Sequence, residues 1–183
     1  MNTLTPENPA EVDNTPVQGF ADCHVGILRR LQALDQLPAL IEPAAQARQI
    51  AAQSLAFFRE AIFEHHLDEE RDLFPAVLAS AQAGDERARV QAMVDRLTQE
   101  HRVIEALWQG LEKDLKRVAR GQDSQLDVGE LHTLVSSYLA HAAFEETEFL
   151  PLSQTILGRN GNHMAALGLS LHLRHAPPVN AYI

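Results

Sequence analysis

The sequence is poor in cysteine, in long apolar runs and in basic residues. Its 183 residues include one cysteine, Cys23, which excludes a disulfide within the chain and favours a reducing compartment. No uncharged stretch approaches the roughly 20 apolar residues of a membrane-spanning helix. Residues 1–16 have neither a basic start nor an apolar core, so no secretion signal is predicted. We therefore expect a cytoplasmic protein.

The charge balance argues about binding partners, and the low content of β-branched residues argues about the fold class. Fifteen Lys and Arg against 25 Asp and Glu leave a formal net charge of −10, which argues against nucleic acid as a partner. Ala, Leu, Glu, Gln and Arg dominate between about residues 16 and 158, where strand-forming clusters are missing. An all-α protein is predicted.

Glycine and proline divide this region into four helices. Short loops between long amphipathic helices predict an antiparallel four-helix bundle over residues 16–158. Residues 1–15 are expected to be a disordered polar segment, and residues 159–183 a C-terminal extension with a candidate short extra helix. The predicted breaks lie at Leu37-Pro38 and Glu42-Pro43, Gly84, Gly121 and Gly158.

Apolar residues recur at alternating steps of three and four along each predicted helix, which gives each helix one stripe facing the interior. Every stripe has a histidine where an apolar residue is expected. The second and fourth helices also place a carboxylate one turn later. Asp72 and Glu148 follow on the same rhythm toward the end of the bundle, and for them a role at the surface or in support of the site is predicted rather than ligation. The interrupting residues are His24, His65 with Glu69, His101, and His141 with Glu145.

The interruptions form an internal repeat. His65 and Glu69 recur 76 positions later as His141 and Glu145, and each HxxxEE string is followed by a proline five residues after its second Glu. His24 and His101 are related by an offset of 77. The bundle is therefore predicted to consist of two duplicated helical hairpins, each with a His on one helix and HxxxE on the other.

Buried imidazoles and carboxylates are costly unless pairing, protonation or a metal satisfies them. The two residues of HxxxE lie one turn apart on one helix face, so both reach the same point. Four His and two Glu can hold two cations, each with two imidazoles and with the carboxylates bridging. Such a set leaves room for a bridging oxide or hydroxide and an external ligand, and it suits Fe, Mn or Zn.

This order of residues resembles the hemerythrin-like, or HHE cation-binding, family. Its members carry a His on the first helix, HxxxE on the second, a His on the third and HxxxE or HxxxxD on the fourth. The four-His, two-Glu set is closer to bacterial iron–sulfur-repair di-iron proteins than to oxygen-carrying hemerythrins, because Glu105 stands where the carriers have a second His. The resemblance implies two iron ions, oxo- or hydroxo-bridged.

Two further residues have open roles. Glu105, one turn after His101, is predicted to be a seventh ligand, an acceptor that orients an imidazole, or a solvated charge. His66 maps onto Ala142 in the repeat, so it is predicted to lie at the surface or to support the site from outside.

The resemblance implies a non-haem di-iron protein that binds oxygen, nitric oxide or peroxide in sensing, storage or stress response. One alternative is a di-iron enzyme with peroxidase, catalase-like or oxidase activity, or an iron donor for cluster repair. Another is a structural bundle that holds zinc or no metal. Neither a membrane nor a nucleic acid is expected as a partner.

Overall fold

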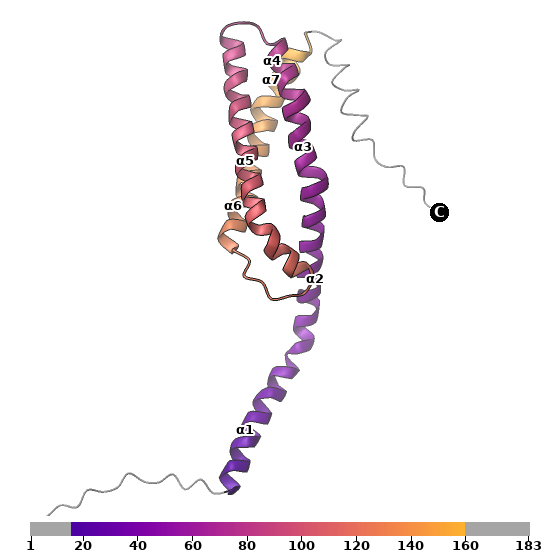
Figure 1. Cartoon of the computed structure of the whole chain (residues 1–183), viewed down its shortest axis with the longest axis vertical. Coiled ribbons are helices and arrows are strands. Elements are labelled where there is room, and N and C mark those ends of the chain that lie inside the picture. The colour runs from indigo at the N-terminus through magenta and orange to yellow at the C-terminus, as the bar shows by residue number, and fades with distance from the viewer. Residues whose placement is uncertain (1–15, 160–183) are drawn as a thin grey trace, which may run out of the picture. The chain divides into compact units, whose positions relative to one another are not determined.

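The structure is a computed structural model, and it describes residues 16–159 (Figure 1). The chain forms two compact units that divide between Gln46 and Ala47, and each is considered by itself. The described part is helical and contains no strand, which confirms the predicted all-α class. The predicted N-terminal polar segment and the candidate C-terminal helix lie outside the described residues.

The first unit contains helix α1 (Pro16–Asp35) and the start of helix α2 (Leu37–Phe57). One non-helical residue, Gln36, separates them. Pro38 occupies the second position of α2, where the missing N–H would have no helical partner anyway. The break predicted at Glu42-Pro43 is wrong, because Pro43 lies inside α2. Proline has no N–H to donate, so one helical hydrogen bond is lost there. The good helix formers that follow Pro43 stabilise the helix enough for it to continue.

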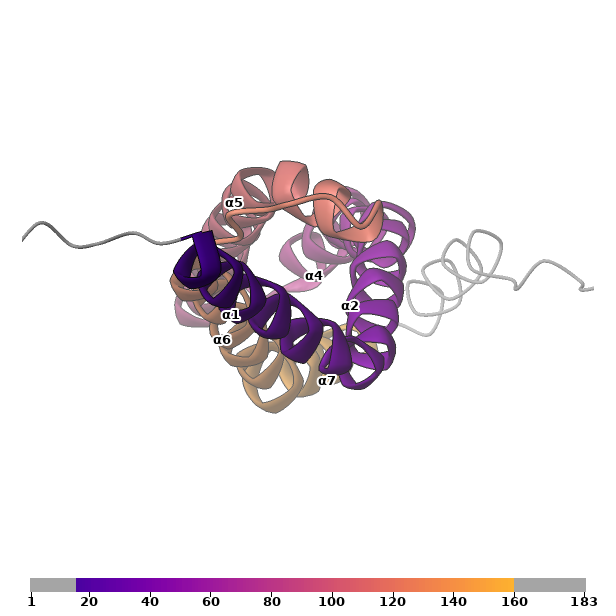
Figure 2. The same cartoon turned by 90° about the horizontal axis from the view of Figure 1, so that it is seen from below.

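The second unit consists of three helical runs joined by short connections, and the first of them continues α2 without a break. Figures 1 and 2 show α5 beside α6, and α4 beside both α5 and α7. Each run reverses the direction of the one before, as the short connections predict. The elements are η1 (Phe58–Ile62), α3 (Phe63–Asp68), η2 (Glu69–Leu73) and α4 (Phe74–Ser80); α5 (Asp85–Ala119); and α6 (Val128–Phe144), η3 (Glu145–Phe149) and α7 (Leu150–Leu157).

The connections contain the glycines that the sequence marks as breaks. Gly84 before α5 has φ 101° and Gly121 after it has φ 66°, a left-handed region that other residues rarely adopt. Asp127 caps α6 by accepting a hydrogen bond from the backbone N–H of Glu130 at 2.9 Å. These local signals fix where α5 and α6 begin, and hence which faces they present to each other.

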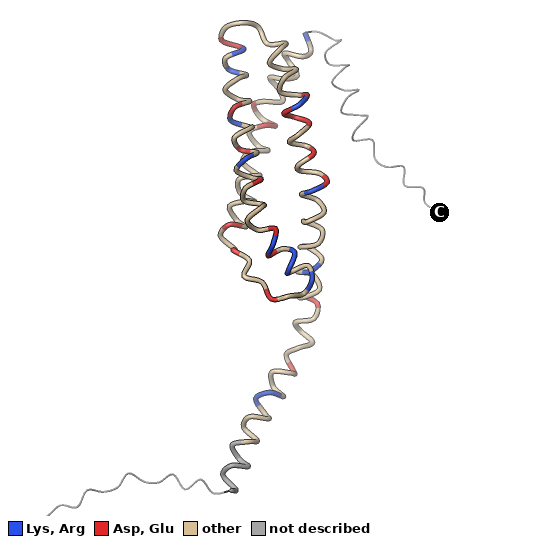
Figure 3. Tube along the Cα trace, viewed as in Figure 1, with Lys and Arg blue, Asp and Glu red and all other residues tan. Residues whose placement is uncertain are grey.

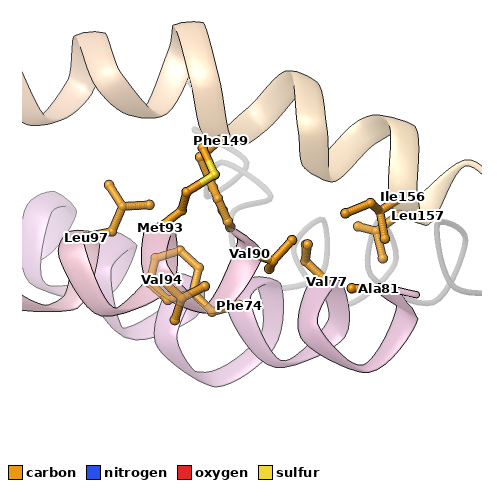
Figure 4. Close-up of a cluster of buried hydrophobic side chains, with 10 residues drawn as sticks. All are labelled: Phe74, Val77, Ala81, Val90, Met93, Val94, Leu97, Phe149, Ile156 and Leu157. Carbon is orange, nitrogen blue, oxygen red and sulfur yellow. The ribbon is translucent and has the colours of Figure 1, made fainter. Parts of the chain in front are cut away.

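Two apolar clusters fill the second unit, one on each side of His101 along α5. Leu97 belongs to the first cluster and Ile104 to the second, and both side chains are fully buried. The buried residues of α5 follow the predicted stripe from Val90 to Leu115. The first cluster, drawn in Figure 4, contains Phe74, Val77, Ala81, Val90, Met93, Val94, Leu97, Phe149, Ile156 and Leu157. The second contains Ala51, Ile104, Trp108, Leu111, Leu115 and Leu134.

Three five-residue π-helical turns, η1, η2 and η3, interrupt the helices of the second unit. The turns η2 and η3 begin at Glu69 and Glu145, and in both the closing backbone hydrogen bond spans five residues. Pro75 and Pro151 follow these turns at equivalent places in the repeat. A proline ring collides with the carbonyl four residues before it, and the wider turn removes this collision.

The π turns displace the apolar stripe from its predicted register. Beyond Glu145 the buried residue is Phe149, whereas Glu148 is exposed and pairs with Arg89 at 3.7 Å. Glu148 thus leaves the stripe and lies at the surface, one of the two roles predicted for it. An extra residue in the turn rotates everything after it by about one position, which a constant helical period cannot anticipate.

Acidic and basic residues are interspersed along α5, whereas the segment from α3 to η2 is mostly acidic (Figure 3). The second unit also has an apolar groove of about 440 Å³ between α2, α5 and α6, lined by residues that include Phe58, Trp108 and Leu134. None of the helices between residues 16 and 159 combines the length and hydropathy that crossing a bilayer requires.

Candidate metal centre

Buried polar side chains gather between the two apolar clusters. Three imidazoles occupy the centre, and none is more than 2% exposed. They come from α3, α5 and α6, so the three helical runs of the second unit each contribute one. The buried polar residues of this region are His66, Asp68, Glu69, His101, His141 and Glu145.

The side chains form two groups whose ligand atoms each lie within 4.8 Å of one another. The first group consists of His66, His101 and His141, and the second of His65, Glu69 and Glu145. Glu69 joins the groups, because its Oε2 lies 3.2 Å from Nε2 of His101 while its Oε1 lies 3.2 Å from Nε2 of His65. Two adjoining sites that share a carboxylate are the arrangement expected for a pair of cations.

Each imidazole of the first group has its Nδ1 against a carboxylate. An ionised carboxylate only accepts hydrogen bonds, so Nδ1 donates and the lone pair is left on Nε2. This is the tautomer that a metal-binding histidine uses when an outer carboxylate orients it. The pairs are His66 with Glu105 at 3.4 Å, His101 with Glu70 at 2.8 Å, and His141 with Glu100 at 3.1 Å.

The inward-facing nitrogen and oxygen atoms of these residues show whether a cation fits between them. Nε2 of all three imidazoles and Oε2 of Glu69 are buried and have no hydrogen-bond partner within the described part of the chain. Buried acceptors without donors are costly, about 1–3 kcal/mol each. Four such lone pairs converge on a small volume, and a cation satisfies all of them at once. The donor set of nitrogen and carboxylate oxygen suits Fe, Mn or Zn.

The electrostatics keep two of the imidazoles neutral. Burial, together with the neighbouring His101, lowers the pKa of His66 to about 3. Burial also lowers the pKa of His141, although its hydrogen bond to Glu100 offsets part of the effect. For His101 burial is outweighed by the adjacent carboxylates of Glu69 and Glu70, so its pKa is raised. Neutral imidazoles are the form that binds metals.

The two buried glutamates behave as a coupled pair. Burial, together with the adjacent Glu69, raises the pKa of Glu145 to about 9. Burial acts to raise the pKa of Glu69 as well, but the adjacent His101 and Glu145 reverse the effect and lower it. The pair thus holds one proton at neutral pH in the polypeptide alone. A cation bound there displaces that proton.

Four of the predicted ligands, His101, His141, Glu69 and Glu145, lie together and buried in the second unit. His65 belongs to the second group, but its side chain is 50% exposed. Its neighbour His66 is buried instead. Ligation by these residues stays a prediction that their placement supports.

The other two predicted ligands lie elsewhere. Glu105 lies outside both groups, on the Nδ1 side of His66, which corresponds to the acceptor role among its three predicted alternatives. His24 is an exposed residue of α1 in the first unit, whose position relative to the second unit is not determined. Its role as a ligand stays a prediction.

The sequence interpretation missed three residues of this centre. His66 was expected at the surface or outside the site, yet it is 1% exposed and stacks on the ring of His101 with centroids 3.9 Å apart. The repeat gives no sign of it, because its counterpart is Ala142. Glu70 and Glu100 were not singled out, although each adjoins a predicted ligand and could be found by asking what holds the far nitrogen of each imidazole.

A cavity of about 490 Å³ borders the second group. It gives a small molecule a place beside Glu69, Glu145 and His141. Tyr138 also lines it, and burial raises the pKa of its hydroxyl, as do the charges of the two glutamates. The hydroxyl therefore stays protonated. The lining residues are His65, Asp68, Glu69, Leu73, Tyr138, His141, Ala142, Glu145, Glu146 and Leu150.

A helical bundle with imidazoles and carboxylates projecting into its core has the form of a cation-binding bundle. The family model of the hemerythrin HHE cation binding domain matches residues 15–153, and the chain belongs to this family. A relative from Haemophilus influenzae, named only as an uncharacterized protein, is 28% identical over 173 residues, which are 91% of this chain and 96% of the relative. No solved structure matches the chain.

Proposed function

We propose that this protein holds two iron ions and binds oxygen, nitric oxide or peroxide at them, in sensing, storage or stress response. The observation that carries the proposal is the pair of adjoining ligand groups joined by Glu69, with four buried inward-facing atoms that lack a hydrogen-bond partner among residues 16–159. Family membership supports cation binding, and the nitrogen and oxygen donor set supports iron.

The roles of the side chains follow from their placement. His66, His101 and His141 would hold one cation, and His65, Glu69 and Glu145 the other, with Glu69 within reach of both. Iron supplies redox chemistry and open positions for small ligands. Ile62, Ile104 and Trp108 are buried nearby and exclude bulk water from this part of the core. The cavity beside Glu145 provides the route by which a small ligand arrives.

The deciding experiment is metal analysis of protein purified without added metal, combined with an absorption spectrum. We expect about two irons per chain and near-ultraviolet absorption typical of an oxo-bridged pair. Zinc in place of iron, or no bound metal, would overturn the proposal and favour the structural alternative.

An enzymatic role is the second candidate, and the protonated Tyr138 hydroxyl in the cavity favours it. A phenol beside two carboxylates can deliver a proton to a bound peroxide. Peroxide added in excess to the iron-loaded protein separates the candidates. Consumption with turnover, lost in a His101→Ala variant, supports an enzyme, whereas uptake that stops at one equivalent per site supports binding.

The cellular location belongs to the proposal as well. Cys23, the single cysteine of the sequence, is exposed and free. An exposed free thiol is compatible with a reducing compartment, and we place the protein in the cytoplasm. Fractionation of cells followed by immunodetection tests this placement.

A further inference from the structure

The carboxylates behind the three imidazoles are themselves held by arginines. Arg102 on α5 contacts Glu70 with one guanidinium nitrogen and Glu105 with the other, the latter at 3.0 Å to both carboxylate oxygens. Arg96, on the same helix, donates from Nε to Glu100 at 2.7 Å. All three carboxylates that face an imidazole Nδ1 are therefore also bound to a guanidinium.

Both arginines join α5 to another helical run. Arg102 reaches from α5 to Glu70 in η2. Arg96 places its guanidinium carbon 3.6 Å from the ring centroid of Phe144, at the end of α6. The planar guanidinium fork fixes the direction of a carboxylate better than an ammonium does. Arg102 thus fixes Glu70 across the junction between α5 and η2, whereas Glu105 and Glu100 are held by arginines of their own helix.

The arginine–carboxylate pairs differ in exposure from an ordinary ion pair at the surface. The arginine side chains are about half exposed, at 49% for Arg96 and 50% for Arg102, whereas the three carboxylates are only 20–28% exposed and the imidazoles behind them at most 2%. An exposed pair stabilises a fold little. Here each arginine instead fixes the position of a carboxylate, and that carboxylate fixes the orientation of a buried imidazole ring.

We propose that Arg102 and Arg96 are positioning residues for the metal centre. They hold Glu70, Glu105 and Glu100 where these carboxylates fix the tautomer and ring orientation of the buried histidines. This inference rests on the proposed metal-binding function. Outer partners of metal-binding histidines typically change metal affinity 10–100-fold when they are removed. Arg102 serves two carboxylates and Arg96 one, so Arg102 has the larger effect.

The test is a titration of the metal-stripped full chain with Co²⁺ in 0.5 M salt, where long-range charge effects are screened. A competing chelator gives the dissociation constant, and the visible bands of Co²⁺ report its coordination geometry. We expect Arg102→Gln to raise the dissociation constant about tenfold or more and to change the bands. We expect Arg96→Gln to do the same to a smaller extent.

Two further variants make the result decisive. Arg89→Gln removes the same charge from α5 at a pair with exposed Glu148, about 18 Å along the helix from His101, and should leave both readouts unchanged. Arg102→Lys keeps the charge but lacks the fork, so it should recover the affinity only in part. If the wild type binds Co²⁺ and Arg102→Gln matches Arg89→Gln, this inference alone is overturned. If the wild type binds no Co²⁺ or iron, the proposed function falls with it.

Discussion

Removing the cation should lower the melting temperature of this protein by about 4–8 °C. Two buried acceptor atoms, Nε2 of His66 and Nε2 of His141, lack hydrogen-bond partners within the described residues, and the lowered pKa of each ring leaves these atoms without a proton. At about 1 kcal/mol each, the low end for such groups, they cost about 2 kcal/mol that a bound cation recovers. The same gain corresponds to a cation present at about 30 times its dissociation constant. For a domain of this size, each kcal/mol shifts the melting temperature by about 2–4 °C.

The assay is far-ultraviolet circular dichroism during heating, with and without a chelator. His101→Ala should abolish most of the difference between the two melting curves. His132→Ala, which changes an exposed histidine of α6 outside both ligand groups, should keep it. Equal melting temperatures in the wild type with and without cation, or an undiminished difference in His101→Ala, would refute the reasoning.

Three further predictions concern the ligands and the core. The ligand role that the sequence predicts for His24 requires His24→Ala to reduce bound iron, measured by metal analysis, whereas unchanged content excludes His24 as a ligand and leaves the six residues of the two groups. In the metal-free protein the proton on Glu145 stabilises the fold below pH 4.5, and this stabilisation is lost as pH rises toward about 9. Cation binding should therefore release a proton at pH 7, detectable in a weakly buffered titration and reduced in Glu145→Gln. Leu97→Ala should cost about 2–5 kcal/mol in urea unfolding, whereas Val103→Ala, at an exposed position, should cost far less.

The family, the helical class and the α5 stripe could be read from the sequence because they depend on spacing within one continuous helix. Val90, Leu97 and Leu111 are buried as their three-and-four rhythm predicts. The glycine breaks at Gly84 and Gly121 were also predictable, since a positive φ selects glycine locally. These features need no knowledge of what packs against them.

The register beyond each π turn could not be predicted in the same way. A constant helical period placed His65 and Glu148 on the inner face, whereas His66 and Phe149 are buried there. The repeated prolines, Pro75 and Pro151, were visible, but their effect on the preceding turn depends on the packing of both flanking segments. The carboxylates that orient the imidazoles could not be predicted for another reason. Glu70 and Glu105 each lie on a different helical run from the imidazole that they contact.

The single tryptophan makes the centre observable without any label. Trp108 is 3% exposed, stacks on Phe58 with ring centroids 3.8 Å apart, and follows His101 on α5 by two helical turns, about 10 Å along the axis. All indole emission therefore originates from one dry environment. A chromophore at the histidines that absorbs in the near-ultraviolet would quench this emission by energy transfer. A fluorimeter can thus follow both loading of the centre and loss of the surrounding packing in real time.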